Sequence, residues 1–83
     1  MNILVRRLSR KTTEEVLHKL FAPFGEIKEL NIVLDEKNGK SKGFGFVEMP
    51  DNKAAKEAIK RLNNTLLDGE RIRVKITKKI KKD

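Results

Sequence analysis

Residues 42–49 combine aromatic rings, glycines and a cation at the alternating spacing of a β-strand. Their sequence, Lys-Gly-Phe-Gly-Phe-Val-Glu-Met, has a period of two, so neighbouring side chains point to opposite faces of a sheet. The apolar Val47 and Met49 suit the buried face together with Gly45, and the glycines are expected to keep the opposite face open. That opposite face carries Lys42, Phe44, Phe46 and Glu48. Flat rings beside a cation suit nucleobases and phosphate; the alternative is an ordinary strand whose rings lie under a helix or another chain.

The length and the residue types that the chain lacks narrow its class of function. The 83 residues suffice for one domain. With no cysteine and one histidine, disulfides, thiolate metal sites and a histidine-based metal cluster are excluded. No apolar run approaches the ~20 residues that a membrane-spanning helix needs. We therefore expect a soluble, cytoplasmic protein (nuclear is the alternative in a eukaryotic host) that needs no cofactor and contacts no membrane.

The chain is strongly basic, and the excess charge is not confined to its end. Twenty Lys and Arg residues against twelve Asp and Glu give a formal net charge of +8. Residues 78–83 hold four lysines and one aspartate, so the rest of the chain keeps +5. Such a charge indicates either a polyanionic partner or a merely soluble surface. We expect residues 1–77 to form the domain and residues 78–83 a basic tail.

Alternating apolar residues and turn signals predict four strands. An Asn38-Gly39 turn is typical of an antiparallel hairpin, and a further turn is expected at Asp68-Gly69. The strands are expected over residues 2–8, 27–34, 42–49 and 71–77.

Two helices are predicted between these strands. Thr12 and Glu15 have the spacing of a capping box, so Thr12 is expected to cap the first helix. Asp51 is placed to cap the second, which ends at Asn63-Asn64. Their buried stripes are expected at Val16, Leu17, Leu20, Phe21 and Phe24 in the first, and Ala54, Ala55, Ala58, Ile59 and Leu62 in the second.

The element order β-α-β-β-α-β is that of the α+β, ferredoxin-like plan. Both helices pack on one face of a four-stranded antiparallel sheet, over inward residues such as Ile3, Val5 and Ile76. No element remains to cover the other face, and a bare face in so small a domain is polar filler or a binding surface. Alternation places on it Leu4, Arg6, Glu29, Asn31, Val33, Lys42, Phe44, Phe46, Glu48, Arg73, Lys75 and Thr77.

Residues 42–49 resemble the octamer of the RNA-recognition-motif family. That octamer runs Lys or Arg, Gly, aromatic, Gly or Ala, aromatic, aliphatic, any residue, aromatic. Seven of the eight positions agree, and Met49 replaces the last aromatic on the core side. The family's hexamer, aliphatic-aromatic-aliphatic-any-Asn-Leu, is matched less well by residues 3–8, where Leu4 replaces the aromatic and Arg7 the Asn. The resemblance covers essentially residues 1–77.

The resemblance implies the strand order 4-1-3-2, with the first and third strands at the centre of the sheet. Phe46 would then stack on a base, Phe44 would pack against a sugar, and Lys42 would pair with phosphate. The two rings are expected to stand uncovered and coplanar. Leu4 offers apolar contact without ring stacking, which lowers the expected affinity. The implied RNA-binding residues are Phe44, Phe46, Leu4, Lys42, Arg6, Arg73, Lys75 and Asn31.

These features favour a monomeric, non-catalytic protein that binds single-stranded RNA and serves in post-transcriptional regulation or as an RNA chaperone. Single-stranded DNA is a close alternative, because stacking does not distinguish the two nucleic acids. A protein-interaction module for an acidic partner is a second alternative, since Leu4 makes the sheet centre more apolar. Phosphatases share the fold, but no carboxylate pair or metal cluster is recognisable, so we expect no enzyme, metal or small-molecule substrate.

Overall fold

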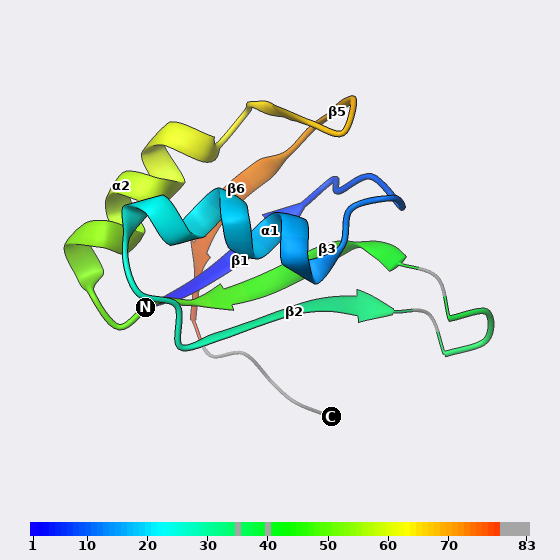
Figure 1. The fold of residues 1–83 in the computed structure, drawn as a ribbon, viewed down its shortest axis with the longest axis horizontal. Coiled ribbons are helices and arrows are strands. Elements are labelled where there is room, and N and C mark those ends of the chain that lie inside the picture. The colour runs from blue at the N-terminus through cyan, green and yellow to red at the C-terminus, as the bar shows by residue number, and fades with distance from the viewer. Residues whose placement is uncertain (35, 40, 79–83) are drawn as a thin grey trace.

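The computed structural model describes residues 1–34, 36–39 and 41–78, without the side chains of Ser41 and Lys42. Figure 1 shows the helices lying on one side of a sheet. The helices are α1 (Glu14–Phe21), the short 3-10 helix η1 (Ala22–Phe24) and α2 (Asn52–Leu62). The strands are β1 (Asn2–Arg6), β2 (Glu29–Leu34), β3 (Ser41–Glu48), β4 (Leu66–Leu67), β5 (Glu70–Arg71) and β6 (Arg73–Thr77).

The main sheet has the order β2-β3-β1-β6, and every neighbouring pair is antiparallel. With β6 as the fourth long strand, this order is the predicted 4-1-3-2, and the predicted ferredoxin-like fold is confirmed. The pairs β2–β3 and β4–β5 form antiparallel hairpins at the two predicted turns. Asp68 and Gly69 have φ of 52° and 83°, as a tight two-residue hairpin turn requires.

The core lies between the sheet and the two helices because β1, β3 and β6 alternate as their sequences predict. Ile3 and Val5 of β1 are fully buried, and Val47 of β3 packs in the same cluster. The apolar side chains of both helices pack into this layer, so both helices cover the same face of the sheet (Figure 1). Their buried residues are Leu17, Phe21, Ala55, Ala58 and Leu62. Within the described residues, no helix has the length and apolar character to cross a membrane.

The predicted cap of the first helix is wrong by one residue. Thr13 caps α1, its hydroxyl oxygen accepting a hydrogen bond from the backbone N–H of Val16 at 3.3 Å. Thr12 is buried and donates its hydroxyl to the Asp68 carboxylate at 2.7 Å. Both threonines have the chemistry of a cap. Because a buried hydroxyl needs a partner, the contact with the distant β4–β5 turn decides which threonine is used.

Three smaller expectations also need correction. Strand β2 begins at Glu29, so Ile27 precedes it. Phe24 is only half-buried, since it lies in η1 at the border of the core and not in the continuous helix. Ile76 is 56% exposed, because it lies near the end of β6, which is an edge strand of the described sheet and pairs with β1. The predicted cap at Asp51 and the end of α2 at Asn63 are confirmed.

Candidate nucleic-acid interface

The register of the sheet gathers the predicted binding residues into two adjacent rows. Directly paired residues of neighbouring strands point to the same face. One row contains Phe44, Arg6 and Arg73, because Arg6 pairs with both of the other two. The next row runs across all four strands as Asn31, Phe46, Leu4 and Lys75. We call these seven residues the aromatic face.

The centre of the aromatic face is apolar and its surround is cationic. Phe44, Phe46 and Leu4 are half-buried, as expected for side chains packed against one another on an open sheet. Asn31, Arg6, Arg73 and Lys75 are exposed. Since the helices cover the other side of the sheet, no helix or strand of the described chain lies over this face (Figure 1). The two rings are therefore available to a ligand.

The two rings are not coplanar, which corrects the sequence-based expectation. Their centroids lie 6.0 Å apart and their planes meet at 89°, an edge-to-face pair. Aromatic pairs favour this geometry because the positive edge of one ring meets the negative face of the other, a gain of about 0.5–1.5 kcal/mol. Two bases that are parallel to each other therefore cannot stack one on each ring. The arrangement suits one stacking ring and one ring that contacts the ligand differently.

Beyond the aromatic face, a third row on the same side of the sheet carries acidic and neutral polar side chains. Glu29, Glu48, Asn2 and Thr77 are paired across the four strands. Lys28 forms an ion pair with Glu48, its Nζ lying 3.7 Å from the carboxylate. Carboxylates thus lie beyond one end of the aromatic face along the strands. Its other end is formed by its own residues Arg6 and Arg73.

Two predicted features fall outside what the structure describes. Lys42 belongs to β3, but its side chain lies outside the described part, so its contact with phosphate stays a prediction. Residues 79–83 of the expected basic tail are also outside the described residues.

Gly45 has a different role from the one expected. A Cβ at this position would lie 2.6 Å from the backbone oxygen of Asn31 and 3.3 Å from Cγ1 of the buried Ile32. Gly45 therefore faces the core side, and the missing side chain permits close approach of β2 to β3. The register of this strand pair shifts between Ile32 and Leu34, immediately beside the contact. Gly45 does not itself keep the aromatic face open.

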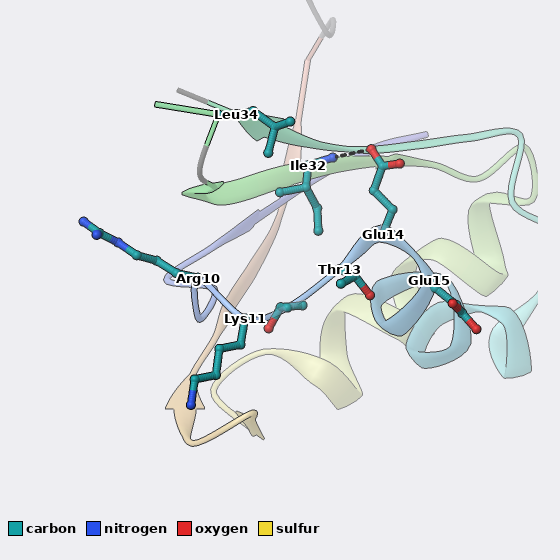
Figure 2. Close-up of a pocket in the computed structure, with 9 residues that line it drawn as sticks. Arg10, Lys11, Thr13, Glu14, Glu15, Ile32 and Leu34 are labelled. Atoms are coloured by element: carbon teal, nitrogen blue, oxygen red, sulfur yellow. Dashed lines mark hydrogen bonds between the residues drawn. The ribbon is translucent and has the colours of Figure 1, made fainter. Parts of the chain in front are cut away.

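One cavity lies away from the aromatic face. It has a volume of about 810 Å³ and opens between the start of α1 and the helix side of β2, with Ile32 and Leu34 on one wall. Figure 2 shows Glu14 reaching across it, where the carboxylate accepts a hydrogen bond from the Ile32 N–H at 3.0 Å. This bond occupies a backbone donor of an edge strand, which otherwise invites pairing with another chain. This hydrogen bond therefore has a structural role: it stabilises the fold.

No described group of three or more His, Cys, Asp or Glu side chains has the arrangement of a metal site. On α2, the Arg61 guanidinium donates a hydrogen bond to Glu57 and lowers the pKa of that carboxyl below its usual value. Both side chains are exposed on the helix side, as the predicted i,i+4 pair, and they do not contribute to the aromatic face.

Sequence reasoning missed Arg10. Together with Arg6 and Arg7 it lines a cavity beside Phe44, although Arg10 is four residues beyond the end of β1. Alternation carries no information beyond the end of a strand. No local signal indicates that the following loop returns to the edge of the aromatic face.

The fold and the site define an open-faced α+β domain with an aromatic and cationic sheet surface. The model of the RNA recognition motif family matches residues 3–73, and the chain belongs to that family.

Individual relatives agree with this assignment. The chain is 43% identical over 67 residues to the human Transformer-2 protein homolog alpha, a match that covers 81% of the chain and 24% of that protein. Among solved structures, "RNA Binding Protein PG1" superposes with a TM-score of 0.94 at 34% identity and covers 99% of both chains. A structure described as a Sex-lethal protein/RNA complex superposes with a TM-score of 0.89 at 30% identity, covering 96% of this chain and 48% of that one. The chain therefore spans about a quarter of the curated relative and about half of the RNA complex's protein chain.

Proposed function

We propose that the protein binds single-stranded RNA on the aromatic face. The observation that carries the proposal is the register that sets Phe46 and Leu4 side by side at the centre of an uncovered sheet, between Asn31 and Lys75. A base stacks on Phe46 and rests partly on Leu4. Phe44, whose ring stands at 89° to that of Phe46, packs against a sugar.

The charged residues around the rings supply phosphate contacts in this proposal. Arg6, Arg73 and Lys75 border the rings, and Lys42 joins them from β3. Asn31 is paired with Phe46 on the neighbouring strand. Its side-chain amide donates hydrogen bonds to a base edge and accepts them from it. The relatives support this reading, because two of the superposed structures are described as an RNA-binding protein and an RNA complex.

We further propose that the protein acts by occupancy, as a cytoplasmic monomer that masks or remodels transcripts without catalysis. Stacking alone does not distinguish RNA from DNA, since only contacts to the 2′-hydroxyl do so. Competition between matched RNA and DNA oligonucleotides separates these two ligands.

Chemical-shift mapping tests the proposed face directly. Titrating isotope-labelled protein with short single-stranded homopolymer RNAs is expected to shift the amides of Leu4, Phe44 and Phe46 strongly. Amides on the exposed side of α2, such as that of Lys56, are expected to stay in place because the sheet separates them from the ligand. Shifts concentrated on α2, or binding that does not weaken with added salt, would contradict the proposal. Tight binding of an acidic peptide with no response to RNA would favour a protein-interaction module instead.

Leu4→Phe is expected to strengthen RNA binding. Stacking of a base on an aromatic ring contributes ~1–3 kcal/mol, and a phenylalanine at this position would lie directly opposite Phe46 on the neighbouring strand. We expect Kd to fall about tenfold, measured by fluorescence anisotropy. Leu4→Met is the matched control, since it keeps an apolar side chain of similar size without a ring. Equal affinities for the two variants would show that no base rests on Leu4.

A further inference from the structure

A basic cavity adjoins the aromatic face at the point where β1 ends. It has a volume of about 340 Å³ and is lined by Arg6, Arg7, Leu8, Arg10, Gly43 and Phe44. We call it the arginine cavity. None of these described lining residues is acidic, and the volume is near the lower end of the range for small-ligand sites. Its wall includes Phe44, so a nucleic-acid strand lying on the rings reaches the cavity without leaving the protein surface.

No ion pair among the described residues neutralises the charges of this cavity. Arg6, Arg7 and Arg10 are all exposed. Within the described part of the chain, the ion pairs join Lys19 to Glu15, Lys28 to Glu48 and Arg61 to Glu57, and none uses these three arginines. Figure 2 shows the Arg10 side chain extending away from α1 and its acidic residues. The cluster is thus a concentration of positive charge that lacks a partner within the described protein.

The backbone at the cavity is bent in an unusual way. Arg7 has a φ of 60°, in the left-handed region that side chains other than Gly, Asn and Asp seldom adopt. The bend is fixed by the next residue, because the Leu8 N–H donates to the Gly43 carbonyl at 2.8 Å. Asparagine suits this conformation better than arginine does. Strained residues cluster at binding sites, and here the strained residue is one of the three arginines that line the cavity.

We propose that the arginine cavity binds a phosphate group of the nucleic-acid strand that continues past Phe44. The planar guanidinium matches phosphate with two parallel hydrogen bonds, and three such groups around one cavity suit an anion with several oxygens. This inference rests on the proposed function and adds Arg7 and Arg10 to the binding residues. The phosphate is either an internal diester of the strand or a phosphate at its end.

The test compares variants of the 83-residue chain by fluorescence anisotropy over a range of salt concentrations. Arg7→Asn with Arg10→Gln is expected to raise Kd about tenfold at low salt. The slope of log affinity against log salt is expected to flatten by about 0.7 for each phosphate of the single strand that the variant no longer neutralises. Lys56→Gln with Lys60→Gln removes the same charge from the exposed side of α2 and is the matched control. It is expected to leave the affinity within about twofold.

A second readout separates binding from folding. Arg7→Asn alone is expected to leave the melting temperature unchanged or to raise it, because asparagine tolerates the left-handed backbone. Weaker binding by a protein at least as stable as the wild type supports a direct contact. Comparing RNA with and without a 5′-phosphate identifies which phosphate is bound. An equal loss of affinity for both RNAs in the arginine variant indicates an internal phosphate. A loss of affinity for the 5′-phosphorylated RNA alone indicates a terminal phosphate.

The inference and the proposed function fail in different ways. If the arginine variant matches its lysine control in affinity and salt slope, while Phe44→Ala with Phe46→Ala still weakens binding strongly, the proposal for the arginine cavity is overturned and that for the aromatic face stands. If the wild-type protein binds none of the RNAs, both are overturned.

Discussion

Replacing Phe44 and Phe46 together by alanine is expected to weaken binding of single-stranded RNA by about 100-fold, because each stacked base contributes ~1–3 kcal/mol and 1.4 kcal/mol is a factor of ten. Both rings are half-buried on the open face of the sheet, and they contact each other edge to face at a centroid distance of 6.0 Å. Alanine removes the surface on which a base lies and leaves the surrounding cations in place. Fluorescence anisotropy at fixed salt measures the effect.

The loss is expected to be unequal between the two rings. Only one base plane fits parallel to a given ring, and the two rings are perpendicular. We expect Phe46→Ala to cost more than Phe44→Ala, since Phe46 lies in the row with Leu4 and Asn31 at the centre of the sheet. An equal loss from the two single variants would indicate that bases stack on both rings, with a reorientation of one of them on binding.

A matched variant distinguishes ring stacking from apolar contact. Phe44→Leu with Phe46→Leu keeps apolar surface on β3 but removes both π systems. We expect it to bind much more weakly than the wild type and only slightly better than the alanine variant. Leucine variants that bind as tightly as the wild type would show that stacking does not hold the ligand. Lys56→Gln, on the exposed side of α2, reports the effect of a distant charge.

The aromatic face was predictable because a strand has a rigid period. Once Val47 is assigned to the core, Phe46 must point the other way, and the structure confirms Val47 as fully buried. The same reasoning places Leu4 and Arg6 outward beside the buried Ile3 and Val5. Pairing them with Phe46 and Phe44 requires the strand order, which comes from the resemblance to a family and not from the periodicity.

Features that depend on contacts between distant segments were not predictable. By sequence Thr12 is the better cap, because Glu15 completes a capping box with it. The use of Thr13 instead depends on the bond from Thr12 to Asp68, 56 residues away. The angle between the two phenylalanine rings depends on side-chain packing, which alternation does not specify. Likewise, the position of Arg10 beside Phe44 depends on the bend at Arg7, a residue type that gives no signal for a left-handed backbone.

Gly45→Ala is expected to destabilise the fold by about 3 kcal/mol, near the upper end of the usual cost of overpacking. The new methyl group would lie 2.6 Å from the backbone oxygen of Asn31 and 3.2 Å from Cα of Ile32. Both are backbone atoms of β2, so neither moves without opening the pairing of β2 with β3. Thermal unfolding followed by circular dichroism is expected to show a fall in Tm of about 15 °C for a domain of this size.

Gly39→Ala is the control for this prediction. Gly39 has a φ of 69°, but a Cβ there would meet no atom of the described residues within 4 Å. Its substitution therefore costs only the backbone strain of about 1–2 kcal/mol. A larger loss at Gly45 than at Gly39 identifies steric conflict between strands as the cause, whereas the reverse order would show that β2 shifts to make room at little cost.

The Gly45 variant also tests how the binding face depends on the sheet beneath it. The added methyl group points to the helix side, because Gly45 pairs with the fully buried Val5 of β1. Below its melting temperature the variant is expected to keep RNA affinity within a few-fold of the wild type, since Phe44 and Phe46 stay on the opposite side. If affinity instead falls as far as in the double alanine variant while the protein remains folded, the spacing between β2 and β3 controls the position of the rings. Asn31 would then connect the added methyl group to the rings, because the methyl group displaces the Asn31 backbone and Asn31 is paired with Phe46.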